Sequence, residues 1–220
     1  TAAHRGMTLG IFGNRRNLVA FQCYGEAYGL LQHDLLHEFL LFYYAHATHL
    51  HTRGTWSVFE CVDMDRDRAQ HAPYCGPAQL TIPAITKWML VFEDPLSPTL
   101  WLAKATPRVW LEDGKRIRVR NAPTRWGRVS YEINSRLAEG QIRARVTLPK
   151  HAPAETKLRL RAPEPHIIKA VEVNGEPWEV FDPEEETISL PARGGEPLEV
   201  EIRYFAEPGP PQTARAWQGG

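Results

Sequence analysis

Val129-Ser130-Tyr131-Glu132-Ile133 and Ile142-Arg143-Ala144-Arg145-Val146 are the segments that decide the fold of the second half of the chain. In both, apolar and polar residues alternate one by one, which is the period of a β-strand with one buried face. Glu139-Gly140 stands between them as a turn signal. The two segments therefore predict neighbouring antiparallel strands, with one face in the core and the other in water.

The same alternation recurs on both sides of this pair. It is found at Leu100–Leu102, Arg108–Leu111, Arg116–Val119, Lys157–Leu160, Ala170–Val173, Thr187–Leu190 and Leu198–Ile202. Asp113-Gly114 and Asn174-Gly175 add further turn signals. Short strands at this spacing predict an antiparallel β-sandwich over residues 95–206. The proline- and glycine-rich residues 207–220 are expected to form a loose tail.

Arginine occupies alternate positions in several of these strands, which indicates a solvated sheet face. The arginines concerned are Arg116, Arg118, Arg120, Arg143, Arg145, Arg159 and Arg161. Glu172, Glu199 and Glu201 are interleaved with them and would cancel their field.

Residues 1–94 have a different pattern, with the spacing of helices. Helices are expected over residues 17–33, from Asp34 as N-cap to about residue 50, and over residues 78–92 after Gly76-Pro77. The second is apolar over most of its surface, which favours packing on two sides, as in helix layers or a toroid. Residues 53–75 show no sustained period and are expected to form a long loop, which is usually functional or disordered.

Composition excludes several classes of protein. Lys plus Arg and Asp plus Glu are both 26, so a net charge of zero argues against a nucleic-acid partner. No run of about 18 apolar residues exists that could span a membrane. The start at Thr1, without Met or a signal-peptide core, suggests a fragment or a processed chain. The three cysteines are far apart, and free thiols are favoured over a bridge between Cys61 and Cys75.

Five histidines near the second helix raise the alternative of a metal site. His33 and His37 are four residues apart, and His46, His49 and His51 follow at the end of the same segment. A spacing of four places two side chains on one helix face, as metal ligands require. No HExxH motif is present, so we expect solvated or hydrogen-bonded histidines, and neither a metal nor a cofactor.

The expected loop holds the residues most suited to chemistry. Glu60 is flanked by Trp56 and Phe59, and a carboxylate among aromatic rings can be partly desolvated, which suits proton transfer. Aromatic rings also stack on the apolar face of a sugar. Arg53, Asp63, His71, Tyr74 and Gln79 could donate or accept hydrogen bonds with sugar hydroxyls. The structural alternative is that Glu60 pairs with Arg53 or Arg66 while Trp56 fills the core.

Gly54-Thr55-Trp56-Ser57-Val58-Phe59-Glu60 resembles the segment before the last helices of α-L-rhamnosidase-like glycoside hydrolases. In those enzymes a Gly/Thr-rich turn leads into Trp-Glu, and the Glu is a proposed general base. The stretch from His71 to Gly76 is similar to their His-containing entry to the next helix. Phe59 stands where Trp is usual, and Cys61 where Arg is frequent. The resemblance extends to the wider six-hairpin glycosidases, in which an (α/α)6 toroid precedes a β-sandwich.

This resemblance implies a fold of α and β in separate segments, with residues 1–94 as the C-terminal helices of an (α/α) toroid. It implies that Glu60 activates a water, while a general acid lies in an upstream part of the same polypeptide. The partners would be that upstream part and a carbohydrate substrate, and the isolated chain would be inactive. Two alternatives remain: a non-catalytic carbohydrate-binding or scaffold module, with Trp126 and Trp178 as platforms, and a polysaccharide lyase. At Trp126 and Trp178 a structural role is favoured.

Overall fold

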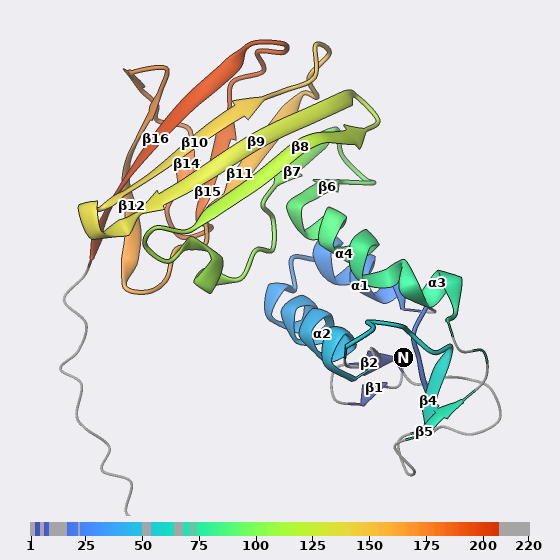
Figure 1. Ribbon diagram of the computed structural model, residues 1–220. Coiled ribbons are helices and arrows are strands. Elements are labelled where there is room, and N and C mark those ends of the chain that lie inside the picture. Colours follow the sequence, from blue (N-terminus) through green and yellow to red (C-terminus); the bar gives the residue numbers. More distant parts are fainter. Residues whose placement is uncertain are drawn as a thin grey trace, which may run out of the picture. The chain divides into compact units, whose positions relative to one another are not determined.

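The computed structural model describes residues 3–4, 7–8, 17–21, 23–49, 54–63, 68–70, 72 and 74–206 (Figure 1). The chain forms two compact units, Thr1–Thr106 and Pro107–Gly220, and each is considered by itself. Helices come first and antiparallel sheets dominate after them, which confirms the predicted order. The expected loose tail at residues 207–220 lies outside the described residues. In the described part of the chain, no helix is long and apolar enough to cross a membrane.

The helices of the first unit follow the predicted apolar spacing, with shifted ends. They are α1 (Tyr24–Gln32), α2 (Leu36–His49), α3 (Gly76–Gln79) and α4 (Thr81–Leu90). On α4, Thr81, Ile85 and Met89 recur every four residues and are fully buried. Pro83 is tolerated because it lies in the first turn, where its missing N–H costs no helical hydrogen bond. The single helix expected over residues 78–92 is divided at Leu80 and ends at Leu90.

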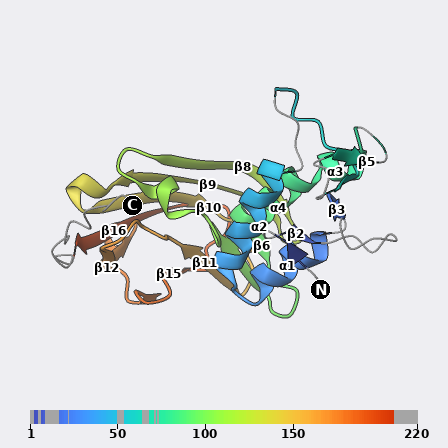
Figure 2. The ribbon, with the colours of Figure 1, turned by 90° about the horizontal axis from the view of Figure 1, so that it is seen from below.

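Aromatic side chains form the contact between α1 and α4, which lie near α2 in Figure 2. The Tyr28 ring centroid is 5.2 Å from that of Trp88 and 5.0 Å from that of Phe92. The Tyr28 hydroxyl donates a 3.0 Å hydrogen bond to the backbone carbonyl of Glu93. Leu41 and Tyr44 of α2 remain 59% and 46% exposed, so this face is open among the described residues.

Short strands replace two predicted features of the first unit. The strands β3 (Asn17–Val19), β4 (Cys61–Asp63) and β5 (Arg68–Gln70) form an antiparallel sheet in that order. The predictions of a helix from residue 17 and of an unstructured loop over residues 53–75 were therefore wrong. Three-residue strands are too short to show a period, and β3 is buried along its whole length.

Two hairpins complete the strands of the first unit. They are β1 (Ala3–His4) with β2 (Met7–Thr8), and β6 (Val91–Glu93) with β7 (Thr99–Leu102). In the second hairpin Leu100 and Leu102 are fully buried.

The second unit is built on a six-stranded antiparallel sheet of order β13-β12-β16-β10-β9-β8. Its strands are β8 (Arg116–Thr124), β9 (Gly127–Arg136), β10 (Gln141–Thr147), β12 (His166–Val173), β13 (Glu176–Pro177) and β16 (Pro197–Ala206). Val129, Tyr131 and Ile133 of β9 are buried, whereas Ser130 and Glu132 between them are not. This confirms the alternation that the sequence predicted.

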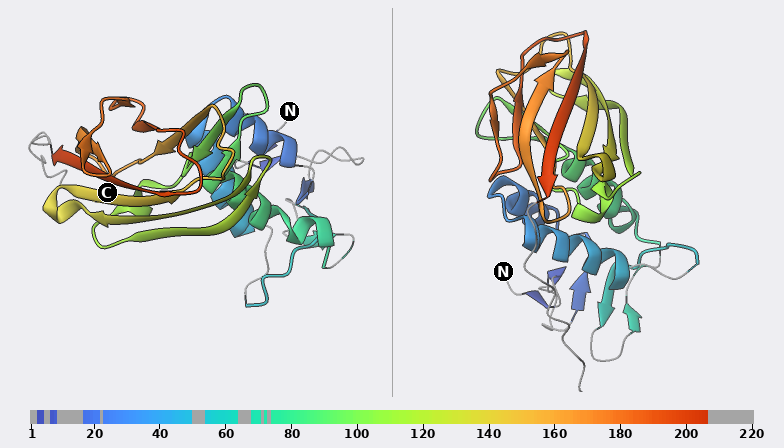
Figure 3. Two further views of the ribbon diagram at one scale, coloured as in Figure 1. Left: turned by 90° about the horizontal axis from the view of Figure 1, so that it is seen from above. Right: turned by 90° about the vertical axis from the view of Figure 1, so that its left-hand side faces the viewer.

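A smaller sheet lies over the large one, and Figure 3 shows the two as layers. Within this unit it contains β11 (Glu155–Arg159), β14 (Phe181–Asp182) and β15 (Thr187–Leu190). Leu158 and Ile188 face each other in register and are fully buried. Asn174 and Gly175 take the left-handed conformation between β12 and β13, as their turn signal predicted.

The prediction of solvated arginines is confirmed on the large sheet and is wrong for Arg159 and Arg161. Arg143 pairs with Glu201 and Arg145 with Glu199, both at 3.3 Å, in cross-strand positions. Arg159 and Arg161, by contrast, are only 2% and 4% exposed. The second pair is buried because carboxylates from a distant turn, Glu185 and Glu186, lie beside them.

One predicted strand is absent. Arg108–Leu111 forms a 3₁₀ helix, η1, and a second 3₁₀ turn, η2 (Leu137–Glu139), connects β9 to β10. A four-residue alternation such as that of Arg108–Leu111 does not distinguish a strand from a 3₁₀ turn, in which residues three apart share a face.

Candidate functional site

Glu60 lies at the entry to β4 and is held by the backbone on both sides. Its N–H donates a 3.1 Å hydrogen bond to the carbonyl of Ala72, and its carbonyl accepts one of 3.0 Å from the N–H of Ala20. The neighbours Val58 and Cys61 are buried at 0% and 1% exposure. Glu60 itself is half-buried. The polypeptide is thus fixed at this point while the carboxylate-bearing side chain keeps access to solvent.

The anchor beneath Glu60 is a small apolar cluster. Val58 packs there with side chains from β3, α2 and α3, and with three partly buried residues at its border. The cluster contains Leu18, Ala20, Ala45, Val58 and Ala78, bordered by Phe21, Val62 and Cys75. Because these residues come from separate elements, burial of Val58 fixes the segment that carries Glu60.

Two exposed aromatic residues flank this segment. Trp56 is 58% and Tyr74 76% exposed. The N–H of Cys75 donates a 3.0 Å hydrogen bond to the carbonyl of Val58, which brings the stretch around Tyr74 beside the stretch from Trp56 to Glu60. The segment of Glu60 and the stretch that pairs with it thus each carry one large ring exposed to solvent.

Both aromatic residues have a left-handed backbone. The φ angle is 52° at Trp56 and 58° at Tyr74. This conformation is uncommon for bulky residues and costs roughly 1 kcal/mol or more at each. Strained positions of this kind cluster at functional sites, because folding alone would favour glycine or asparagine there.

Gln79 contacts Trp56 directly. Its side-chain amide nitrogen donates a 2.9 Å hydrogen bond to the backbone carbonyl of Trp56. Gln79 is the last residue of α3, which has Pro77 in its first turn. The Gln79 side chain is exposed. Backbone hydrogen bonds thus place the segment of Trp56 and Glu60 beside the stretch around Tyr74, and Gln79 contacts the backbone of Trp56.

The remaining predicted residues are placed differently. Asp63 is 5% exposed in β4, opposite Asn17 of β3. Arg53 and His71 lie outside the described residues, as does Arg66, the alternative partner of Glu60. The support that Ala20 and Ala72 give to Glu60 was not predicted, because it is made by backbone groups and carries no side-chain signal.

The residue after Glu60, Cys61, is a buried thiol with a raised pKa. Burial raises the pKa of the Cys61 thiol to about 11, and the nearby Glu60 carboxylate adds to this effect. Cys61 is accordingly a neutral thiol near pH 7, and a neutral thiol is a poor nucleophile. Cys23, Cys61 and Cys75 are free cysteines, which confirms the prediction of free thiols.

The histidines do not assemble into a metal site among the described residues, where no group of three or more potential ligands is found. His46 is 1% exposed, and its Nδ1 lies 3.9 Å from the sulfur of Cys23. The Cys23 thiol does not act as an anionic ligand near neutral pH, because burial raises its pKa to about 12.

Trp126 and Trp178 of the second unit both contact other residues of the protein. The indole N–H of Trp178 donates a 2.9 Å hydrogen bond to the carbonyl of Ser189. Trp126 is half-buried, and the Arg125 guanidinium lies 4.1 Å from its ring centroid. These contacts agree with the structural role that the sequence favoured.

Comparison with known proteins gives no family assignment. No protein-family model matches the chain, and no curated protein matches it significantly. Partly similar solved structures include two GH127 enzymes. One is a GH127 β-L-arabinofuranosidase from Geobacillus stearothermophilus T6, with 15% identity and a TM-score of 0.36, covering 87% of this chain and 33% of that one. The other is a GH127 β-arabinofuranosidase, with 15% identity and a TM-score of 0.35, covering 93% and 38%. The chain thus spans 33% and 38% of the length of these two proteins.

Proposed function

We propose that this chain is the C-terminal part of a glycoside hydrolase, in which Glu60 is the general base that activates water. The observation that carries the proposal is the position of Glu60. It is half-buried, its backbone is fixed by Ala20 and Ala72, and its segment carries the exposed Trp56 and pairs with the stretch that carries the exposed Tyr74. A glycosidase needs a carboxylate beside a surface that stacks on a sugar ring.

In the proposed reaction the Glu60 carboxylate accepts a proton from a water as that water attacks the anomeric carbon. A carboxylic acid on the opposite side of the glycosidic bond protonates the leaving oxygen. Inversion at the anomeric carbon follows if the two carboxyl groups are about 6.5–9.5 Å apart, which leaves room for the water. The acid would come from an upstream part of the same polypeptide.

The helical unit supports this arrangement. The exposed Leu41 and Tyr44 leave one face of α2 open, which suits a helix of an (α/α) toroid that packs on two sides. The antiparallel sheets would then be a β-sandwich that supports the toroid. The finer assignment, to α-L-rhamnosidase-like enzymes, rests on the resemblance of the segment from Gly54 to Glu60.

A non-catalytic carbohydrate-binding module is the second candidate. The exposure of Trp56 and Tyr74 supports a binding module as much as a hydrolase, because stacking on a sugar needs no carboxylate. A polysaccharide lyase would be distinguished from a hydrolase by its products, which are unsaturated and absorb in the near ultraviolet.

The test uses the longer polypeptide that carries this chain and its preceding helices. Turnover is measured on p-nitrophenyl glycosides that include α-L-rhamnoside and β-L-arabinofuranoside. Glu60→Gln is expected to lower kcat by about 10²–10⁴-fold, the usual contribution of a general base. The matched control is Glu38→Gln, an exposed acid of α2 in the same unit. The isolated 220 residues are expected to be inactive.

Saccharide binding with unchanged turnover in Glu60→Gln would overturn the hydrolase proposal. Binding without any turnover by the longer polypeptide would favour the binding module.

A further inference from the structure

The outer face of the large sheet carries a cross-strand row of alternating charge. Arg118 of β8 is opposite Glu132 of β9, which is opposite Arg145 of β10, and this in turn is opposite Glu199 of β16. Arg118 and Glu132 form an ion pair, and Arg145 pairs with Glu199 at 3.3 Å. Every arginine in this row has a carboxylate beside it.

The next row lacks its carboxylate. Ser130 of β9 is opposite Thr147 of β10, so two hydroxyl groups occupy the positions that Glu132 and Arg145 hold in the first row. Arg120 of β8 projects at the start of this row, where a bulge interrupts the pairing between Val119 and Ala122. Arg120 is exposed and forms no ion pair or hydrogen bond with the described part of the chain.

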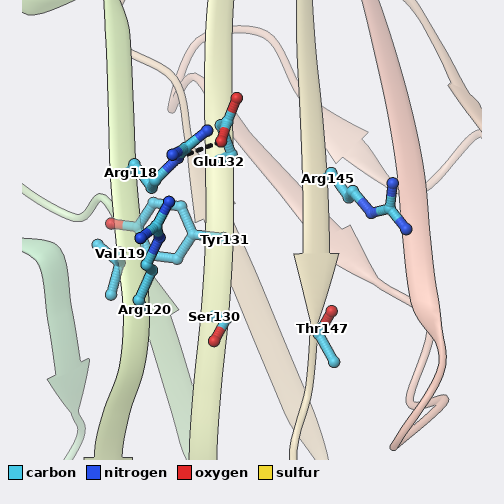
Figure 4. Close-up of a pocket in the computed structure, with 8 residues that line it drawn as sticks. All are labelled: Arg118, Val119, Arg120, Ser130, Tyr131, Glu132, Arg145 and Thr147. Carbon is cyan, nitrogen blue, oxygen red and sulfur yellow. Dashed lines mark hydrogen bonds and ion pairs between the residues drawn. The ribbon is translucent and has the colours of Figure 1, made fainter.

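These side chains surround one depression of about 280 Å³ (Figure 4). In Figure 4 the guanidinium groups of Arg118 and Arg120 project from the same strand, whereas that of Arg145 points towards the neighbouring strand. Arg118, Arg120 and Arg145 line the depression together with Glu132, and Arg145 is paired with Glu199 outside it, so Arg120 contributes the remaining positive charge. Glu132 does not compensate Arg120, because it is already bound by Arg118, which holds the pKa of Glu132 below its usual value.

The donors in the second row are suited to an oxyanion. Ser130 Oγ accepts a 2.9 Å hydrogen bond from the N–H of Asn121, so its own proton is directed elsewhere. Asn121 holds a left-handed backbone at the bulge, with φ of 52°. Bulges often lie beside binding sites, because they redirect a side chain. A planar guanidinium group matches the geometry of a carboxylate.

We infer that the depression formed by Arg120, Ser130 and Thr147 binds the carboxylate group of an acidic sugar. The carboxylate would take the place that a glutamate has in the neighbouring row, facing Arg120, and the two hydroxyls would donate to it. The oxyanion part of the inference stands on these residues alone. The choice of a sugar as its carrier rests on the proposed function.

The test is a titration of the 220-residue chain with sodium D-galacturonate at low ionic strength, followed by NMR. D-galactose and sodium sulfate are titrated in parallel. We expect galacturonate to shift the amide signals of β8, β9 and β10, and galactose to leave them unchanged. Arg120→Gln should weaken galacturonate binding by about tenfold or more, in line with the loss of one hydrogen bond to a charged group. Its melting temperature should not change, because Arg120 is exposed.

Arg136→Gln is the matched control, since it removes the same charge from the far end of β9. Thr147→Val tests the hydroxyl row and should weaken binding several-fold. Equal binding of galacturonate by Arg120→Gln, equal binding of galactose, or tighter binding of sulfate than of galacturonate would each overturn the inference. The titration follows the amide signals of β8, β9 and β10 and does not depend on turnover at Glu60. A failure of the hydrolase proposal is therefore separable from a failure of this site.

Discussion

The side-chain amide of Gln79 donates a 2.9 Å hydrogen bond to the backbone carbonyl of Trp56. This bond ties the end of α3 to the turn that precedes Glu60, across 23 residues of sequence. It stabilises a carbonyl whose residue has a φ angle of 52°. Gln79 is thereby a positioning residue for the Trp56 ring, in addition to any contact of its own with a ligand.

Gln79→Glu tests this role with almost no change in shape. The variant replaces the donating amide by a carboxylate, which repels the Trp56 carbonyl. We expect saccharide affinity to fall by about fivefold, the equivalent of one neutral hydrogen bond of about 1 kcal/mol. Calorimetry with the longer polypeptide measures the effect, and Gln141→Glu in β10 is the control. Unchanged affinity would show that the Trp56 turn does not need this bond.

Trp56→Gly and Tyr74→Gly are expected to separate binding from stability. Glycine adopts a positive φ without strain, and both side chains are largely exposed, so little packing is lost. The free energy of unfolding should stay the same or rise by up to about 1 kcal/mol. Saccharide affinity should fall at least about tenfold. Urea unfolding and calorimetry on the same preparations give both values, and a loss of stability above about 2 kcal/mol would mark the two residues as structural.

Glu186→Gln should strongly destabilise the second unit. The Glu186 carboxylate accepts hydrogen bonds of 2.5 and 3.1 Å from Arg108 and lies 4.0 Å from the buried Arg161. Glutamine removes the negative charge that lies beside Arg108 and the buried Arg161, at a cost of roughly 3 kcal/mol. Glu199→Gln on the solvated face is the control and should cost less than about 1 kcal/mol. Equal effects in thermal unfolding would contradict the difference in burial.

The buried thiols of Cys23 and Cys61 should make the free energy of unfolding fall at alkaline pH. Burial raises the pKa of Cys23 to about 12 and that of Cys61 to about 11. In the unfolded chain thiols ionise near about 8.5, so their contribution to stability is complete below that pH and is lost as the pH rises towards 12. Urea unfolding between about pH 8 and 11 should show this fall. Cys23→Ala should make the fall shallower, and an identical slope would exclude the thiol as its cause.

The strands of the large sheet were predictable because their one-residue alternation reports directly on which face is buried. Val129, Tyr131 and Ile133 behave as this pattern requires. Alternation does not reveal whether the second face is covered as well. The alternation therefore predicted solvated side chains for Arg159 and Arg161, although both are buried and lie beside the carboxylates of Glu185 and Glu186 from a distant turn.

The sequence proposed residues for the candidate site, and it gave no indication of the backbone contacts that support them. The sequence singled out Trp56 and Glu60, because an acid among aromatic rings is unusual in a polar stretch. The strand β3 was missed, since Asn17–Val19 is too short to show a period and continues into helical spacing. The left-handed backbone at Trp56 and Tyr74 also has no signature in residue type, because tertiary hydrogen bonds impose it.

The most direct test of the central claim is a crystal structure of the longer polypeptide carrying Glu60→Gln, with a saccharide bound. We expect a sugar ring stacked on Trp56 or Tyr74, with the side chain at position 60 one water molecule away from the anomeric carbon. A saccharide bound over Trp126 or Trp178 instead, with position 60 facing no cavity, would contradict it.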